Sequence, residues 1–379
     1  IYTLSLHDAL PISSLGGATQ TTLMGTGGIK SDRSVTNEAK AIDASHLGFL
    51  DPIHIPEGTK TGVNLRMPMG VVKIGKTPHI SVYNTKTGKM EVVPPSEFMS
   101  NSVVLPDQVH WKNGKPVPIS KTVKIAGKNN DMSMMQFKDA KYVMRHSSQL
   151  FNTTSNLIPF LGNTSGNRAG MAARQMEQSI SLLNREAPLV QVSTGVNQPG
   201  NETFERVMGH ATSHRAPVDG VVKSVKPGSI MIQDPAGKMH EVQTYNNYPL
   251  NDAKSVLTSE AIVREGAKVK KGQVLADTNF SRNGEIALGT NLRVAYMPYK
   301  GYNFEDGVVI SESAAKKLSS VHLHKPSTPT KGLQFGKNGF LTKHTGIYKK
   351  DQVENIGNDG IIRVGARVKP GDPLILATK

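Results

Sequence analysis

VREGAKVKKGQVLADT, residues Val263–Thr278, has a pattern that returns later in the chain as IRVGARVKPGDPLILAT, residues Ile362–Thr378. Both contain, in order, Gly, Ala, a basic residue, Val and Lys. A second Gly follows one residue later, and an apolar run comes after it. Glycine accepts the positive φ that tight turns need, so each stretch predicts two short strands joined at Lys271–Gly272 or at Pro370–Gly371. Ala216–Asp234 predicts the same order of strand, turn and strand.

The rest of the chain favours the same fold class. Among 379 residues, 36 Gly and 22 Pro separate short runs rich in Val and Ile, which is typical of strands in barrels or sandwiches. The clearest helix is predicted from Ser165 to Glu186, where Met171, Met176, Ile180 and Leu183 share one face and are interpreted as core. We therefore expect a mainly β protein with a few helices and a barrel-sandwich hybrid core.

Composition restricts the function without deciding it. Lys and Arg number 45 against 30 Asp and Glu, a net charge of +15, which fits a protein that handles phosphates and equally a solvated basic surface. The absence of Cys excludes disulfides and thiolate metal sites and is compatible with a reducing cytoplasm. No apolar run approaches the ~20 residues that span a bilayer, so no membrane association is expected.

Ile1–Ser13 differs in character from the sequence that follows it. The stretch IYTLSLHDALPIS lacks the basic and long apolar regions of a signal peptide and looks like translated sequencing adapter. We expect it to be an artefact outside the fold.

Near the middle of the last third, GYNFEDGVVISES (Gly301–Ser313) places Glu305 and Asp306 side by side. They stand between an aromatic-rich turn and an apolar run that predicts a strand. Taken alone, the pair fits a capped turn on the surface of a barrel.

Several stretches, taken in order, resemble the β subunit of multisubunit DNA-dependent RNA polymerases, in a partial and divergent, phage-like or uncultured-microbe form. The resemblance runs from about Met24 to Lys379 and is least clear over Met67–Tyr142. The stretches that carry it are MGTGGIKSDR (24–33), DASHLGFLDPIHIPEGTKTGVNL (43–65), NLIPFLGNTSGNRAGMAARQMEQSI (156–180) and GEIALGTNLRVAYMPYKGYNFEDGVVISES (284–313).

The resemblance implies a fragment of the catalytic subunit that forms part of the active-site cleft for template-directed RNA synthesis. Implied partners are the DNA template, the RNA product, nucleoside triphosphates, a β′-type subunit and α-type or other subunits, in a bacterial cytoplasm or a phage-infected cell. The family's primary Mg²⁺ is held by three aspartates of the β′-type partner, and this sequence has no such motif. The chain alone is therefore expected to be inactive.

The resemblance also implies roles for individual residues. Glu305 and Asp306 would help to hold a second Mg²⁺, shared with the partner and partly through water, because Mg²⁺ prefers carboxylate and water oxygens. Arg168 would present its planar guanidinium to a triphosphate, with a surface salt bridge as the alternative. The residues implied to contact nucleic acid or nucleotide are Arg33, Glu57, Lys60, Arg174 and Gln178.

The implied organisation is a fork-like region at 14–66, an inserted β-rich external domain at 67–145 and a hybrid-binding barrel-sandwich domain with a double-psi barrel-type core at 146–379. The last domain is expected to be truncated at its C-terminal end.

Two other functions stay open. A non-catalytic nucleic-acid-binding or scaffold protein would have kept the barrel and lost the chemistry, and it predicts salt-dependent binding without activity. A lipoyl-like carrier would use the repeated hairpins, but no carrier lysine of that kind stands at a turn tip.

Overall fold

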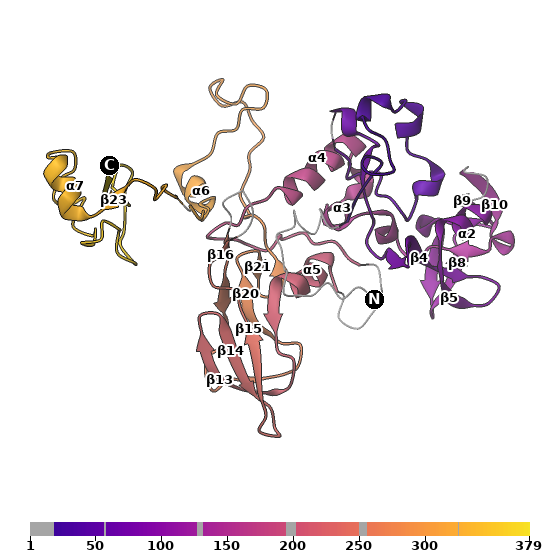
Figure 1. The fold of residues 1–379 in the computed structure, drawn as a ribbon. Coiled ribbons are helices and arrows are strands. Elements are labelled where there is room, and N and C mark those ends of the chain that lie inside the picture. The colour runs from indigo at the N-terminus through magenta and orange to yellow at the C-terminus, as the bar shows by residue number, and fades with distance from the viewer. Residues whose placement is uncertain (1–18, 57, 127–131, 195–201, 250–255, 325) are drawn as a thin grey trace. The chain divides into compact units, whose positions relative to one another are not determined.

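The computed structural model describes residues 19–379 except 57, 127–131, 195–201, 250–255 and 325. The predicted artefact at Ile1–Ser13 lies outside these residues. The chain divides into two compact units, Ile1–Leu323 and His324–Lys379. The fold is mainly β with a few short helices, which confirms the predicted class (Figure 1). The domain boundaries after residues 66 and 145 stay predictions.

The first segment is closed on itself by two strands. β1 (Gln20–Thr22) pairs antiparallel with β2 (Asn64–Arg66), so the intervening residues form one long loop. Gly62 has a φ of 71°, and a Cβ there would lie 2.4 Å from the carbonyl oxygen of Lys40. The ammonium of Lys40 also donates to the Thr59 carbonyl at 3.0 Å. Only glycine permits this close approach of two turns of the loop.

A seven-stranded sheet follows, in the order β10-β9-β6-β11-β4-β3 with β5 paired to β4. Its strands are β3 (Val72–Ile74), β4 (Thr77–Asn84), β5 (Lys89–Val93), β6 (Val103–Val104), β9 (Thr122–Ala126), β10 (Ser133–Gln136) and β11 (Tyr142–Val143), and α2 (Pro95–Ser100) joins β5 to β6. Phe49 from the preceding loop packs edge-on against Phe98 of α2, with ring centroids 5.5 Å apart. The sheet and the preceding loop therefore share a core.

A separate hairpin shows how local sequence sets a turn. β7 (Val109–Lys112) and β8 (Lys115–Pro118) are joined by Asn113 and Gly114, whose φ values are 50° and 75°. A two-residue hairpin turn needs positive φ at both positions, and Asn-Gly is the pair that best provides it.

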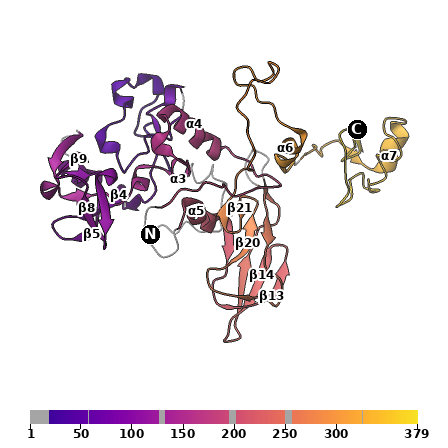
Figure 2. The ribbon, with the colours of Figure 1, turned by 180° about the vertical axis from the view of Figure 1, so that it is seen from behind.

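Short helices link the sheet to a small β-sandwich. They are α3 (Thr153–Asn156), α4 (Gly166–Glu177) and α5 (Phe204–Thr212). One sheet of the sandwich contains β12 (Ser213–Arg215), β20 (Val274–Thr278) and β18 (Ser259–Ala261), and the other contains β15 (Met239–Gln243), β14 (Ser229–Gln233), β13 (Gly220–Lys226) and β19 (Lys268–Val269). Their inward side chains form one buried cluster, and Figure 2 shows β13, β14 and β20 of the sandwich from the reverse direction.

Shorter elements complete the chain. Three pairs of two-residue strands are β16 (Tyr248–Pro249) with β17 (Val256–Leu257), β21 (Ser281–Arg282) with β22 (Glu285–Ile286), and β23 (Gln334–Phe335) with β24 (Ala377–Thr378). The remaining helices are α6 (Glu312–Lys317) in the first unit and α7 (Lys337–Lys343) in the second. The second unit is built on its own small core of Val353, Ile356 and Leu376.

The two repeated stretches keep the same turns in different surroundings. Gly266 and Gly272 have φ values of 84° and 82°, and the corresponding Gly365 and Gly371 have 85° and 92°. In the first copy the turn joins two strands as predicted, although these strands belong to different sheets. In the second copy the prediction of two strands is wrong, because only β24 forms there and the other pairings are isolated bridges.

The predicted helix from Ser165 to Glu186 is also too long. α4 ends at Glu177, and three of the four side chains expected to face the core, Met171, Ile180 and Leu183, are exposed. After the helix, the Leu183 amide donates to the Ser319 carbonyl at 2.8 Å. Beyond α4 the backbone is therefore bonded to a distant segment and does not continue the helix that the apolar periodicity alone predicts.

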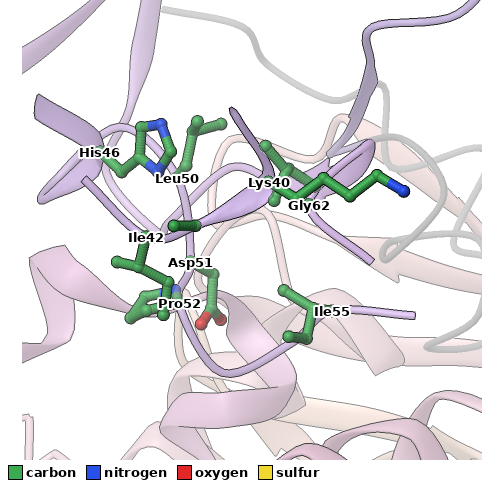
Figure 3. Close-up of a pocket in the computed structure, with 10 residues that line it drawn as sticks. Lys40, Ile42, His46, Leu50, Asp51, Pro52, Ile55 and Gly62 are labelled. Carbon is green, nitrogen blue, oxygen red and sulfur yellow. The ribbon is translucent and has the colours of Figure 1, made fainter. Parts of the chain in front are cut away.

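The buried carboxylate of Asp51 joins residues 51–54 to residues 152–155 of the first unit. Figure 3 draws Asp51 among the residues that line a small cavity. One oxygen accepts the amides of Ile53 and His54 at 2.6 and 3.1 Å. The other accepts the Asn152 amide and the Ser155 hydroxyl, both at 2.6 Å. The cavity beside it holds about 20 Å³, room for about one water molecule. The charge is therefore satisfied by the protein itself.

A second network fixes α4 to the same region. His54, 2% exposed, has Nε2 2.7 Å from Glu177 Oε2, the distance of an ion pair although the angle falls short of a hydrogen bond. Its Nδ1 lies 2.9 Å from the Thr154 hydroxyl, and Arg66 Nη2 lies 2.7 Å from Glu177 Oε1. Burial would raise the pKa of Glu177, but His54 and Arg66 outweigh it and hold that pKa below its usual value of 4.5.

We predict that Asp51→Asn lowers the free energy of unfolding by about 2 to 3 kcal/mol, because an amide NH₂ would face a donor that now meets an oxygen. Urea unfolding of the chain, followed by circular dichroism, measures the change. Asp107→Asn is the matched control, since Asp107 is exposed. Equal urea midpoints for Asp51→Asn and the control would contradict the role given to Asp51.

A second prediction concerns pH. Because the pKa of Glu177 is lower in the folded chain, its charged contacts stabilise the fold above about pH 4.5 and are lost as pH falls through the folded pKa. Glu177→Gln should therefore lower the urea midpoint more at pH 6 than at pH 3.5. The exposed Glu354→Gln should follow the unsubstituted chain at both values. A Glu177→Gln effect that does not change between these pH values would refute the network.

Candidate functional site

The loop that carries the acid pair is held by its own side chains. Asn303 Nδ2 donates to the Met297 carbonyl at 2.7 Å, and Asn303 Oδ1 accepts the Tyr299 amide at 2.8 Å. At Gly307 a Cβ would lie 2.9 Å from the Tyr302 carbonyl oxygen, so glycine keeps the turn tight. The loop is thus an ordered turn that presents its side chains to solvent.

Glu305 and Asp306 lie at the exposed side of this turn. Glu305 has a φ of 53°, a left-handed conformation that is costly for a residue other than Gly or Asn. Neither carboxylate forms a hydrogen bond or ion pair with any described residue, so both keep their oxygens available to a ligand. The capped turn considered as an alternative role is not formed by these side chains.

The strand predicted after the acid pair is not present. Residues 307–310 form no strand, and Val308 is 80% exposed. A strand needs a neighbour with which to exchange backbone hydrogen bonds, and within the described part of the chain residues 308–310 have no backbone hydrogen-bond partner. The apolar side chains of Val308, Val309 and Ile310 are therefore exposed to solvent next to the acid pair.

Glu186 holds the two ends of the acid-pair loop, at Asn291 and at Lys317. The Glu186 amide donates to the Gly289 carbonyl at 2.8 Å. Its carboxylate accepts the backbone and side-chain amides of Asn291 at 2.9 Å and the ammonium of Lys317, in α6, at 3.2 Å. These bonds, first that from the Asn291 backbone, lower the pKa of Glu186 to about 2. The stretch that enters the loop and the helix that follows it are thus tied to one carboxylate.

Arg168 lies in the first turn of α4 and is exposed. Its guanidinium lies 3.8 Å from the sulfur of Met171 and forms no ion pair with any described acid. The surface salt bridge considered for Arg168 is therefore not formed.

The C-terminal half of α4 borders a cavity of about 240 Å³. Arg174 and Gln178, four positions apart, line it, and their binding roles stay predictions. The cavity also contains polar groups that the sequence analysis missed: Gln20, His54, Asn64, Arg66 and Glu177. No periodic pattern marks His54 or Arg66, and their link to Glu177 spans more than 100 positions, so nothing in the sequence signalled this site.

Arg33 and Lys60 are placed on two turns that touch. The Thr59 hydroxyl donates to Asp32 Oδ2 at 2.5 Å, which joins the turn of Asp32–Ser34 to that of Gly58–Lys60. Both basic side chains are exposed. Glu57, also predicted as a site residue, lies outside the described residues.

The donor atoms limit what this site could hold. Across the described ranges, no group of three or more His, Asp or Glu side chains is arranged to hold a metal ion. Glu305 and Asp306 suit the hard oxygen-seeking Mg²⁺ but can fill only a few of its six positions. In the same ranges, no helix has the length and apolar character needed to cross a membrane.

Comparison with known proteins agrees with the resemblance. A family model described as RNA polymerase Rpb2, domain 3 matches residues 11–69, and one described as RNA polymerase Rpb2, domain 6 matches residues 215–379. The second match includes Glu305 and Asp306, and the first includes Arg33, Glu57 and Lys60.

Curated relatives extend the similarity across the chain. The DNA-directed RNA polymerase subunit beta of Desulfosudis oleivorans is 30% identical over 378 residues, which cover 96% of this chain and 27% of the relative. The subunit of the same name from Aquifex aeolicus is 28% identical over 381 residues, 98% of this chain and 25% of the relative. The chain spans about a quarter of the length of these relatives, and it belongs to the β-subunit family of DNA-directed RNA polymerases.

Proposed function

We propose that this chain forms part of the active-site cleft of a DNA-directed RNA polymerase and takes part in nucleotidyl transfer together with a β′-type partner. The observation that carries the proposal is the similarity to β subunits over 96% of the chain, which includes the acid-pair loop. The DNA template, RNA product, nucleoside triphosphates and further polymerase subunits would be its partners, in a cytoplasm.

In this proposal Glu305 and Asp306 assist a Mg²⁺ ion that arrives with the nucleotide. Mg²⁺ in such a reaction neutralises charge on the phosphates as the transfer proceeds. Among the described residues, neither carboxylate has a partner to displace, and the bonds of Asn303 keep both on one ordered turn. The remaining ligand positions would come from the nucleotide, from water and from the partner's acids.

Arg168 would bind the triphosphate. A guanidinium without an acid partner can turn both of its N–H edges to phosphate oxygens, whereas a salt-bridged one cannot. Arg174 and Gln178, one to three turns further along α4, would contact nucleic acid or nucleotide at the cavity they line. Arg33, Lys60 and Glu57 would contribute from the loop of the first segment.

The acid pair can be tested in the assembled polymerase. Glu305→Gln with Asp306→Asn should raise the Mg²⁺ concentration needed for half-maximal RNA extension and slow extension about tenfold or more at limiting Mg²⁺. The control is Glu312→Gln, whose carboxylate is exposed and paired only with Lys316. Extension kinetics unchanged across a Mg²⁺ titration would refute the role of the pair.

A separate prediction concerns Arg168. Arg168→Ala in the assembled enzyme should raise KM for nucleoside triphosphate about tenfold, the loss expected for a charge-assisted contact. Arg168→Lys should restore only part of it, because an ammonium cannot bind two oxygens as a planar fork. If KM is unchanged in both variants, Arg168 does not contact the nucleotide.

The alternative, a non-catalytic nucleic-acid-binding or scaffold protein, predicts that the same variants leave every property of the assembly unchanged except nucleic-acid affinity. The exposed, unpaired state of Glu305 and Asp306 favours the catalytic proposal, because a surface that only binds phosphate gains nothing from adjacent acids.

A further inference from the structure

The two repeated turns present cations at equivalent positions. We define the first basic loop as residues 264–273 and the second basic loop as residues 363–372. Each has three matching basic side chains, and all six are exposed: Arg264 and Arg363, Lys268 and Arg367, Lys270 and Lys369. The repeat is therefore one of charge as well as of backbone.

The same hydrogen bonds build both loops. In each, an alanine amide donates to the carbonyl of the first arginine, at 3.1 Å in the first loop and 3.2 Å in the second. In each, a side-chain oxygen accepts the amide of the matching lysine: Gln273 takes that of Lys270 at 3.1 Å, and Asp372 takes that of Lys369 at 2.8 Å. The cations thus stand on rigid turns, which reduces the entropy lost on binding.

The acids beside the first loop are turned toward the backbone. Glu265 accepts the Val225 amide at 3.1 Å, and Asp219 accepts the Lys271 amide at 2.6 Å. Neither carboxylate is within ion-pair distance of a loop cation. The cations of the first basic loop are therefore not neutralised by these acids and face the solvent.

The second loop shows the same arrangement. Besides the Lys369 amide, Asp372 accepts the Gln352 side chain at 3.2 Å. Within the described part of the second unit, no Lys or Arg is within ion-pair distance of an Asp or Glu. Residues 324–379 hold ten Lys and Arg against four Asp and Glu, so this short unit carries +6 of the chain's +15.

We propose that the two basic loops bind the phosphate backbone of nucleic acid, independently of base sequence and of the acid-pair loop. Exposed cations that neutralise phosphates release counterions, which is the main source of affinity in such binding. Phosphate fits better than an acidic protein, because the cations are the only exposed side chains beyond glycine that the two loops share. Val364, fully exposed in the second loop, corresponds to Glu265 in the first, so no apolar contact surface is shared.

Salt-dependent binding of the full chain tests this. Fluorescence anisotropy with a labelled 20-base-pair DNA duplex, without Mg²⁺ or nucleotide, gives affinity between 50 and 300 mM KCl. Arg264→Gln, Lys268→Gln and Lys270→Gln form one variant, and Arg363→Gln, Arg367→Gln and Lys369→Gln form another. The matched control removes equal charge from exposed positions in or beside the β7–β8 hairpin: Lys112→Gln, Lys115→Gln and Lys121→Gln.

Each loop variant should weaken binding at least tenfold at 100 mM KCl and reduce the slope of log K against log salt by about 2 to 3, near 0.9 per lost phosphate contact. Circular dichroism should show unchanged folding. Slopes equal to that of the unsubstituted chain, or an equal loss in the control, would overturn the proposal. So would competition by polyglutamate as strong as by unlabelled duplex, which would indicate an acidic protein. Because no Mg²⁺ or nucleotide is present, a failure here leaves the test of Glu305 and Asp306 unaffected.

Discussion

The buried carboxylate of Asp51 is the constraint on which the first unit depends. Removing a charge from water costs several kcal/mol unless donors replace the solvent. Three backbone amides and the Ser155 hydroxyl do so here, and they come from two segments about 100 residues apart. The same contact fixes the backbone of His54, whose ring then reaches Glu177. Through that chain of contacts α4 is held, and with it Arg174 and Gln178.

The chain treats its acids in two ways. The first group accepts hydrogen bonds or ion pairs from amides and cations of the protein, and it contains Asp51, Glu177 and Glu186. These contacts lower the pKa of Glu177 and of Glu186, and they make all three groups structural. Glu305 and Asp306 accept no hydrogen bond from a described residue, although Glu305 occupies a backbone conformation that costs of order 1 kcal/mol. A strained, unpaired acid gives the fold nothing that an amide would not give, so its presence is better explained by a ligand than by stability.

How much the sequence predicts depends on how local each feature is. The turns at Gly272 and Gly371 depend on bonds within a few residues, and the sequence pattern predicts both. The Asn113–Gly114 turn is equally local, although the sequence analysis did not single it out. The start of α4 is local too, but beyond Glu177 the chain is bonded to a distant segment at Ser319, which no periodicity reports. The polar cavity was missed for the same reason, since Arg66 and Glu177 meet only after the chain has folded.

The two repeated stretches show, within one molecule, which features depend on local bonds and which depend on distant contacts. Both copies form the same glycine turns and share the hydrogen bonds made within each turn, although the first copy is also bonded to Ala216, Asp219 and Val222. Only the first copy continues into two strands, since β12, β13 and β18 are there to pair with them. The second copy has β23 alone and otherwise forms isolated bridges. The repeated turn presents its cations in two unlike settings, in the first copy with Lys268 inside β19 and in the second with no strand at the matching Arg367. A charged surface can therefore repeat where the strands do not.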